Sequence, residues 1–395
     1  MLKQIEGSRA IAEAVAMCRP QVICAYPITP QTHIVEDIGA MVKSGELANC
    51  EFINVESEFA ALSVAIGASA AGARAYTATA SQGLLYMTEA VYNASGMGLP
   101  IVMTLGNRAI GAPINIWNDH SDAMALRDAG WIMLFAETNQ EAADLHFQAF
   151  RLAEELSTPM MVCVDGFILT HAYEQVELPE QREVDAWLPP FHPKQVLDPS
   201  DPITMGALVG PESFSEVRYL AHRKQLEALE RIPALAKEFE GHFSREAGGL
   251  LRTYWTDGAD TIILAMGSVC GTIKDVIDDM RDTGHAIGAL ILTTYRPFPF
   301  ESVREALAGA SNVIVVEKSL SAGMGGPLAA DVKLALAKNS QTVYSIIAGL
   351  GGRAITKASL RSIFERVRLG ELPDTTFLDL NWDLITEAIT NNYEV

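Results

Sequence analysis

The feature that most constrains the fold of this chain is an alternation of apolar, strand-like runs with helix-like segments. Over residues 6–170 the apolar runs, each bounded by turn residues, are VICAYPI, EFINV, ARAYTATA, LPIVMTLGN, GWIMLFAE and TPMMVCVDG. Segments with helical spacing, such as SEFAALSVAIGASAAG, separate them. Strands that are apolar throughout and alternate with helices are typical of a parallel sheet covered on both faces. The sequence therefore predicts an α/β fold.

The same alternation resumes near residue 258 and predicts a second parallel-sheet domain, as the length of 395 residues also favours. Its strand-like runs are TIILAMGSVCG, AIGALILTTYRPF, SNVIVVEKS and QTVYSIIAGLG. Between the domains, residues 172–210 are rich in proline and acidic residues and predict a long excursion or linker. The mixed charges of residues 214–243 indicate a solvated or docking helix rather than a core helix.

We place the domain boundaries accordingly. The first domain is predicted over residues 1–245, with the excursion and the docking helix occupying 172–245. The second is predicted over residues 246–395 and ends in a C-terminal tail whose position we do not predict.

Charge and hydropathy exclude several classes of function. The formal net charge of −20 repels nucleic acids and anionic membranes, which leaves small molecules and protein partners. No apolar run reaches the ~18 residues of a membrane span. The N-terminus becomes polar and acidic too early for a signal peptide, so we expect a cytoplasmic protein. The five cysteines contain no Cys-x-x-Cys pair and are expected to be small buried residues, not disulfides or metal ligands.

The loops after the strands are the first places to search for a site, because ligands of open parallel sheets bind beyond the carboxyl ends of the strands. The first predicted strand is followed by Tyr26-Pro27-Ile28-Thr29-Pro30. Residues before proline favour an extended backbone, and proline fits the first position of a helix. Thr29 is then either the N-cap of the next helix, which the local pattern favours, or a hydroxyl held rigidly at the ligand edge.

Two further loops carry charged candidates. Glu56 and Glu58 begin a helix of small apolar residues, where they either stabilise the helix N-terminus or include a catalytic carboxylate with a raised pKa. The apolar surroundings favour the second interpretation more than usual. Arg108 follows the fourth strand and is the only cation that this topology places near Thr29 and Glu58. It either clamps a substrate carboxylate or is an ordinary surface arginine.

A polar run after Arg108 contains Asp119, His120 and Asp122. Hard cations need more carboxylates at defined spacing than this run supplies, so we expect its side chains to cap the following helix. We expect no metal site in this chain.

Glycine-rich loops give weaker signals. Residues 321–331 and 348–354 do not complete a dinucleotide-binding fingerprint, and we expect them to serve tight turning and close packing. The turn over residues 266–272 is a candidate phosphate cradle through its backbone amides.

An ordered set of motifs resembles a known family. In chain order the motifs are YPITP, SEFAA, NR, APINIWNDHSD, FILTH and YRPFP. Together they closely resemble the α subunit of multi-subunit 2-oxoacid:ferredoxin oxidoreductases, the pyruvate type above all. The likeness covers essentially the whole chain, and the ordered set is specific although each motif alone is not. It implies a thiamine-diphosphate pyrimidine-binding domain followed by a transketolase C-terminal-like domain.

The resemblance also implies roles for single residues. Glu58 matches the family glutamate that bonds the aminopyrimidine ring of thiamine diphosphate and favours the tautomer that removes the thiazolium C2 proton. Pro27 and Ile28 would line the cofactor. Thr29 and Arg108 match positions whose hydroxyl and guanidinium grip the 2-oxoacid carboxylate. The implied reaction is oxidative decarboxylation of pyruvate to acetyl-coenzyme A and CO2, or its reverse.

The chain lacks other parts that this family needs. It has no Gly-Asp-Gly motif with a downstream asparagine for Mg²⁺ and diphosphate, and no cysteine clusters for electron transfer. The resemblance therefore implies thiamine diphosphate shared with a partner subunit, and Mg²⁺ and [4Fe–4S] clusters in partner subunits of β, γ and δ type. Coenzyme A would be the co-substrate, and ferredoxin or a similar protein the electron acceptor.

Two alternatives stay open. The same chemistry on a branched-chain or aromatic 2-oxoacid, such as 2-oxoisovalerate or phenylglyoxylate, is equally compatible with Thr29. A second substrate carboxylate would require another cation, which these loops do not offer. The other alternative is a non-catalytic dinucleotide-binding or interaction subunit.

Overall fold

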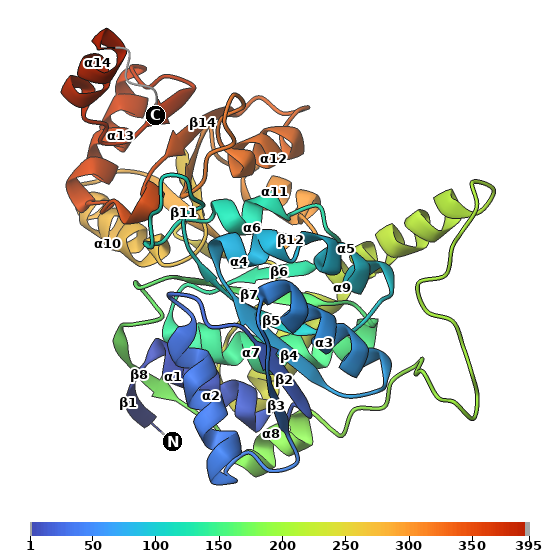
Figure 1. The fold of residues 1–395 in the computed structure, drawn as a ribbon. Coiled ribbons are helices and arrows are strands. Elements are labelled where there is room, and N and C mark those ends of the chain that lie inside the picture. Colours follow the sequence, from blue (N-terminus) through green and yellow to red (C-terminus); the bar gives the residue numbers. More distant parts are fainter. Residues whose placement is uncertain (1, 392–395) are drawn as a thin grey trace.

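The computed structural model describes residues 2–391 and contains a large sheet in each half of the chain (Figure 1). The first sheet has the strand order β12-β6-β7-β5-β4-β2-β3. Its strands are β2 (Val22–Ala25), β3 (Glu51–Asn54), β4 (Ala75–Thr79), β5 (Val102–Asn107), β6 (Ile132–Phe135), β7 (Met160–Asp165) and β12 (Thr294–Arg296). All pairings among β2 to β7 are parallel, which confirms the prediction from the apolar runs.

The second sheet has the order β15-β14-β13-β10-β11-β9. Its strands are β9 (Leu251–Tyr254), β10 (Thr261–Ala265), β11 (Ile287–Leu292), β13 (Asn312–Glu317), β14 (Thr342–Ile347) and β15 (Thr375–Phe377). The four predicted strands are its centre, β10, β11, β13 and β14. The edge strands β9 and β15 escaped prediction because they are short and none of their residues is fully buried.

Helices cover both sheets. Those of the first half are α1 (Gly7–Met17), α2 (Thr32–Ser44), α3 (Glu58–Ala70), α4 (Ser81–Tyr86), α5 (Thr88–Gly96), α6 (Ser121–Ala125), α7 (Asn139–Leu156), α8 (Gln181–Trp187) and α9 (Phe214–Phe243). Those of the second half are α10 (Val269–Arg281), α11 (Phe300–Ala306), α12 (Pro327–Ala335), the 3₁₀ turn η1 (Leu350–Gly352), α13 (Lys357–Leu369) and α14 (Trp382–Thr390).

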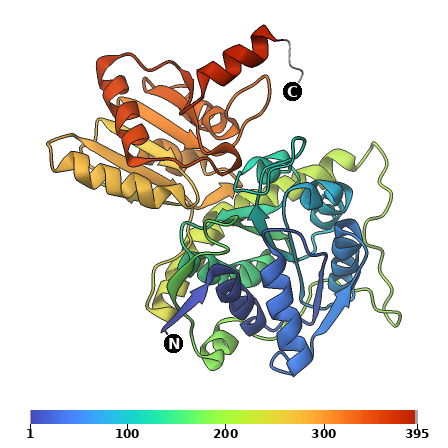
Figure 2. The ribbon, with the colours of Figure 1, turned by 60° about the vertical axis from the view of Figure 1, so that its left-hand side comes forward.

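The two faces of the first sheet belong to different apolar cores. On one face, α1, α2 and α7 pack with the end of α9. On the other, side chains of α3 and α5 join a cluster that continues into α11 and α12 of the second half. Figure 2 shows the second half, orange to red, stacked on the first. The halves therefore share a continuous hydrophobic core.

The predicted linker over residues 172–210 is more ordered than expected. Its first part forms β8 (Tyr173–Glu177), which pairs antiparallel with β1 (Leu2–Glu6), and then helix α8. Because β1 and β8 are far apart in the sequence, no local pattern predicts that they pair.

The interpretation of α9 as a solvated helix is wrong for its second half. Ala228, Ile232, Leu235 and Phe239 lie at helical spacing and are buried in the first core. The first half of α9, with the irregular chain before it, projects from the body (Figure 1). Within residues 2–391, no helix is both long enough and apolar enough to cross a membrane.

Candidate functional site

The carboxyl ends of four adjacent strands bring the predicted site residues to one edge of the first sheet. Along β3-β2-β4-β5, the residues that follow are Glu58 after β3, Thr29 after β2, Ser81 after β4 and Arg108 after β5. The chain leaves β2 toward β3 on one side, while β4 lies on the other side. This reversal is the switch point at which open α/β sheets bind ligands.

The loop after β2 does not cap α2 as expected. Helix α2 begins at Thr32, two residues after Pro30, and its N-cap residue Gln31 makes no side-chain capping bond. The backbone N–H of Gln31 donates to the carbonyl of Ile28 (3.0 Å), and the Thr29–Pro30 bond is cis. A tight turn therefore separates Thr29 from the helix, and the Thr29 side chain is exposed at the sheet edge.

Arg108 is directed toward this turn. Its Nη1 donates to the Thr29 carbonyl (2.9 Å) and its Nε donates to the Asn115 carbonyl (3.3 Å). The residue is only 8% exposed, which excludes the interpretation as an ordinary surface arginine. Burial lowers the pKa of Arg108, against the opposing effect of Asp122. The structure thus joins Thr29 and Arg108, and the guanidinium keeps other donors for an anion.

Asp122 connects the ends of two strands beside the site, a role that the sequence pattern did not predict. Its Oδ2 accepts the backbone N–H groups of Ser81 (2.9 Å) and Arg108 (3.0 Å), and its Oδ1 accepts from the Asn107 side chain (2.9 Å). One carboxylate therefore holds the ends of β4 and β5 together. Burial raises the pKa of Asp122 to about 6, although these hydrogen bonds oppose the rise.

The predicted helix capping by the polar run is therefore largely wrong. Only Asp119 bonds to the first turn of α6 from outside, by accepting the Ser121 N–H (2.7 Å). The N-cap residue, His120, makes no capping bond and instead reaches Asp165. Polar residues before a short helix resemble helix caps in the sequence. In the structure, two of the three side chains, those of His120 and Asp122, instead form hydrogen bonds with residues at neighbouring strand ends.

Glu58 is the first residue of α3, whose N-cap Ser57 accepts the Ala60 N–H (3.2 Å). The Glu58 side chain is half-buried and lies over Gly83 of α4: a Cβ added there would stand 2.8 Å from Glu58 Oε1 and 2.6 Å from Thr79 Oγ1. Within residues 2–391, neither the Glu58 carboxylate nor the buried Thr79 hydroxyl has a hydrogen-bond partner. The absence of a side chain at Gly83 thus allows these two unsatisfied polar groups to lie directly against α4.

A buried polar network fastens this edge to the second half. Asp165, at the end of β7, accepts from His120 Nε2 (2.6 Å), Lys318 Nζ (2.7 Å), and the backbone N–H (2.9 Å) and hydroxyl of Ser268. Burial alone would raise the pKa of Asp165, but Lys318 and His120 hold it well below its usual value.

This network also corrects the interpretation of residues 266–272 as a phosphate cradle. The amide of Ser268 in that turn already binds the carboxylate of Asp165, so an anion of the protein itself occupies the position.

The loop between Arg108 and His120 is held by the second half as well. The Asn115 side chain donates to the Gly351 carbonyl (3.1 Å), the Gly351 N–H donates to Asp119 Oδ2 (3.2 Å), and the His120 N–H donates to the Lys318 carbonyl (2.7 Å). The glycine loop over residues 348–354 therefore does pack closely, and it packs against the loop that follows Arg108 in the first half.

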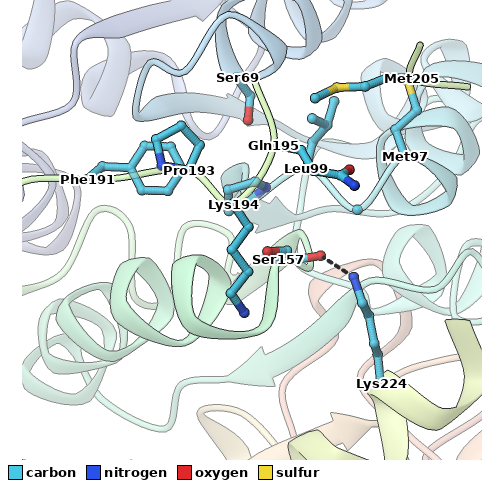
Figure 3. Close-up of a pocket in the computed structure, with 12 residues that line it drawn as sticks. Ser69, Met97, Leu99, Ser157, Phe191, Pro193, Lys194, Gln195, Met205 and Lys224 are labelled. Carbon is cyan, nitrogen blue, oxygen red and sulfur yellow. Dashed lines mark hydrogen bonds between the residues drawn. The ribbon is translucent and has the colours of Figure 1, made fainter. Parts of the chain in front are cut away.

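A cavity of about 250 Å³ lies at the opposite edge of the first sheet (Figure 3). Leu99, which lines it, precedes β5, so the cavity faces the amino ends of the strands. Its lysines donate to carbonyls at the end of α7, Lys194 to Glu155 (2.6 Å) and Lys224 to Ser157 (3.3 Å). Cations at a helix C-terminus need no further ligand, so this cavity is not the candidate site.

Comparison with known families agrees with this geometry. Residues 13–237 match the family described as pyruvate flavodoxin/ferredoxin oxidoreductase, thiamine diphosphate-binding, and residues 259–360 match the pyruvate:ferredoxin oxidoreductase core domain II. The chain belongs to the pyruvate:ferredoxin oxidoreductase family. The resemblance read from its motifs is thereby confirmed, as is the order of its two α/β domains.

Relatives match over nearly the full length. The chain is 48% identical to pyruvate synthase subunit PorA of Methanosarcina barkeri, covering 96% of this chain and 97% of the relative. It is 43% identical to the PorA subunit of Thermotoga maritima, covering 93% and 95%. A ketoisovalerate oxidoreductase subunit, VorA of Pyrococcus abyssi, is 39% identical, covering 93% of each chain. Family members are thus enzyme subunits that share this whole architecture.

Solved structures show the same fold. A 2-oxoglutarate:ferredoxin oxidoreductase from Magnetococcus marinus superposes with a TM-score of 0.68 at 18% identity, covering 93% of this chain. This chain spans 65% of that larger chain. A split-gene transketolase superposes with a TM-score of 0.54 at 14% identity, covering 93% and 99%. Both likenesses concern the arrangement of the two α/β domains.

Proposed function

We propose that this chain is the α-type subunit of an enzyme that oxidatively decarboxylates pyruvate to acetyl-coenzyme A and CO2, or runs the reverse reaction. The observation that carries the proposal is the convergence of Glu58, Thr29 and Arg108 at the switch point of the first sheet. Membership of the family and the high identity to pyruvate synthase subunits support it.

The residues present fit the aminopyrimidine half of thiamine diphosphate. The Glu58 carboxylate and the Thr79 hydroxyl both lie against Gly83, and neither has a protein partner in the described chain. When bound, thiamine diphosphate supplies a carbon nucleophile and stabilises the negative charge left by CO2 loss. Glu58 would accept a hydrogen bond from the protonated ring nitrogen and hold that proton in place. Pro27 and Ile28 would line the ring from the β2 turn.

Arg108 and Thr29 would bind the substrate carboxylate. Arg108 is fixed by its backbone bond to Asp122 and by its side-chain bond to the Thr29 carbonyl, so its remaining N–H groups need no reorganisation to bind an anion. The exposed Thr29 side chain stands on the same turn and can donate its hydroxyl.

A partner subunit would complete the site. Tyr26 follows β2, and Phe59 and Tyr86 belong to α3 and α4; they are 38%, 37% and 63% exposed, which makes them aromatic groups suited to burial by another chain. We propose that a β-type partner carries the Mg²⁺–diphosphate half of the cofactor. We further propose that [4Fe–4S] clusters reside in partners of β, γ or δ type, which pass electrons to ferredoxin or a similar acceptor, and that coenzyme A takes the acyl group. We place the complex in the cytoplasm, and the domain boundary of this chain at residues 245/246.

A branched-chain substrate is the second candidate, favoured by the identity to the ketoisovalerate oxidoreductase subunit. The purified complex, assayed with pyruvate, 2-oxoisovalerate and phenylglyoxylate in the presence of coenzyme A and ferredoxin, separates the candidates. Turnover of pyruvate far below that of the other acids would overturn the pyruvate assignment. A nicotinamide titration of the isolated chain tests the dinucleotide-binding alternative.

Glu58→Gln in the assembled enzyme tests the role of the carboxylate. We expect decarboxylation to fall by about 10²–10⁴-fold, because glutamine cannot hold the ring proton. Glu56→Gln is the matched control, since this neighbouring glutamate is exposed and is not among the groups nearest to Gly83. Near-normal turnover by the Glu58 variant would contradict the assignment.

A further inference from the structure

A second cluster of chemically active side chains lies on the first domain, outside the residues used above. Glu6 ends β1, His33 is in the first turn of α2, and His171 is in the turn after β7. One donor atom of each lies within 4.8 Å of the donor atoms of the other two. Three elements that are distant in sequence therefore present two imidazoles and a carboxylate to a common point.

The geometry of the first pair suits a shared ligand. His33 Nδ1 and Glu6 Oε1 are 2.8 Å apart. Without a metal this is a hydrogen bond; donors that stand ~2.1 Å from one tetrahedral ion are about 3.4 Å apart, so the pair would open by about 0.6 Å on binding. The Glu6 side chain is 18% exposed and that of His33 is 48% exposed, so an ion can enter from solvent.

His171 is held as an oriented ligand. The Thr170 hydroxyl contacts its Nδ1 (2.7 Å) and also accepts the Phe167 N–H (2.8 Å). If that oxygen accepts both donors, Nδ1 carries the proton and the lone pair stays on Nε2, the arrangement that a metal-binding histidine uses. Two bonds from Ser8 to the Thr170 carbonyl (2.7 and 2.9 Å) and a tilted contact between the Phe167 and His171 rings (4.6 Å between centroids) fix the group.

Contrary to the expectation from sequence that this chain has no metal site, we propose that Glu6, His33 and His171 form a binding site for a divalent first-row transition metal, with Zn²⁺ as the expected ion. Two nitrogens and one carboxylate oxygen are donors that Zn²⁺, Co²⁺ and Ni²⁺ accept, whereas Ca²⁺ and Mg²⁺ favour all-oxygen sets. The donor atoms lie within 4.8 Å of one another, so rotations of these half-buried or exposed side chains that shorten the largest separation by at most about 1.4 Å bring the set to the ~3.4 Å spacing of a tetrahedral site. A water would complete a tetrahedron.

The consequence of binding is local. His33 lies four residues after Thr29, so the ion would tie the start of α2, next to the β2 turn, to the end of β1 and to the turn after β7. This site goes beyond the proposed function and does not depend on it, because it uses none of the residues assigned to thiamine diphosphate or the 2-oxoacid.

Cobalt binding to the full-length, untagged chain tests the site. After treatment with a chelator and its removal, Co²⁺ is titrated while its visible d–d absorption is recorded, and Zn²⁺ is then added in competition. We expect one Co²⁺ per chain, displaced by Zn²⁺. His33→Gln and His171→Gln should bind more than about 100-fold more weakly, and Thr170→Val about 10-fold more weakly, as for loss of an outer-shell partner.

The control is His192→Gln, an exposed histidine outside the cluster, which should bind like the parent chain. Melting curves recorded without metal check that each variant folds, and the exposed position of His33 makes its variant the decisive one. An unchanged Co²⁺ isotherm for His33→Gln and His171→Gln, or no absorbing complex in the parent chain, would overturn the proposal and leave a hydrogen-bonded surface pair only.

Discussion

Removal of the Lys318 ammonium should reveal how strongly the two halves of the chain depend on each other. Lys318 is 3% exposed and donates to Asp165 and to the Ser268 hydroxyl (3.0 Å). Lys318→Met keeps much of the side-chain volume but leaves the Asp165 carboxylate, which is 1% exposed, with only His120 and Ser268 as partners. The variant therefore isolates the electrostatic contribution of one buried charge.

We expect Lys318→Met to lower the free energy of unfolding by about 3–5 kcal/mol, the usual cost of removing one partner of a buried ion pair. The double variant Asp165→Asn/Lys318→Met should recover much of this loss, because it leaves no unpaired buried charge. Lys357→Met, which removes an exposed ion pair with Asp275, serves as the control and should leave the unfolding midpoint unchanged. Urea unfolding followed by tryptophan fluorescence measures all three.

The pH dependence of the free energy of unfolding provides a second test, because the direction of its change can be predicted. The pKa of Asp165 in the folded protein is well below its usual value, so its contribution to stability is present above the unfolded pKa and is lost as the pH falls through the folded pKa. Without Lys318 the folded pKa rises, and the carboxyl group accepts a proton at higher pH. The loss in free energy of unfolding caused by Lys318→Met should then be largest at pH 7 and decrease toward pH ~4. A variant as stable as the parent, or a double variant no more stable than Lys318→Met, would refute the reasoning.

Two further predictions concern the candidate site. Gly83→Ala would place a methyl group 2.8 Å from Glu58 Oε1 and displace the carboxylate, so turnover by the assembled enzyme should fall by about 10²-fold. Gly67→Ala, whose added methyl meets nothing within 4 Å, should leave turnover unchanged; equal activity of the two variants would contradict the role of Gly83 in positioning Glu58. Arg108→Lys should raise the KM for the 2-oxoacid by about 10–100-fold with a smaller effect on kcat, because an ammonium cannot bond the Thr29 carbonyl and also grip a carboxylate bidentately; a loss confined to kcat in steady-state assays would argue against a role in substrate binding.

The alternation of apolar runs with helix-like segments was enough to predict the central strands of both sheets and the sheet edge that carries the candidate site. The strands from β2 to β7 are continuous apolar runs, and such runs alternating with helices have few other arrangements. Glu58 and Arg108 were found because each follows such a run directly. Thr29 lies at the predicted edge, but the N-cap role that its local pattern favoured is wrong, since that pattern could not show the turn that separates it from α2.

The supporting residues of the site could not be predicted, because their partners are distant in the chain. Asp122 binds the ends of two strands, and Lys318 reaches Asp165 across 153 residues. The only local hints were a run of polar residues that resembled helix caps and a single lysine after an apolar strand. The strands β1 and β8 were missed for the same reason, as each pairs, within residues 2–391, with a strand far away in the sequence.

The strand β12 has a consequence for how this protein is made. It belongs by sequence to the second half, yet it pairs with β6 and forms the edge of the first sheet. During synthesis at ~5–20 residues per second, the edge of β6 therefore stays open until residues 294–296 leave the ribosome. An open strand edge is a template for wrong pairing between nascent chains. The first half cannot complete its own sheet, so a gene division at the domain boundary would yield a fragment inclined to aggregate rather than an independent module.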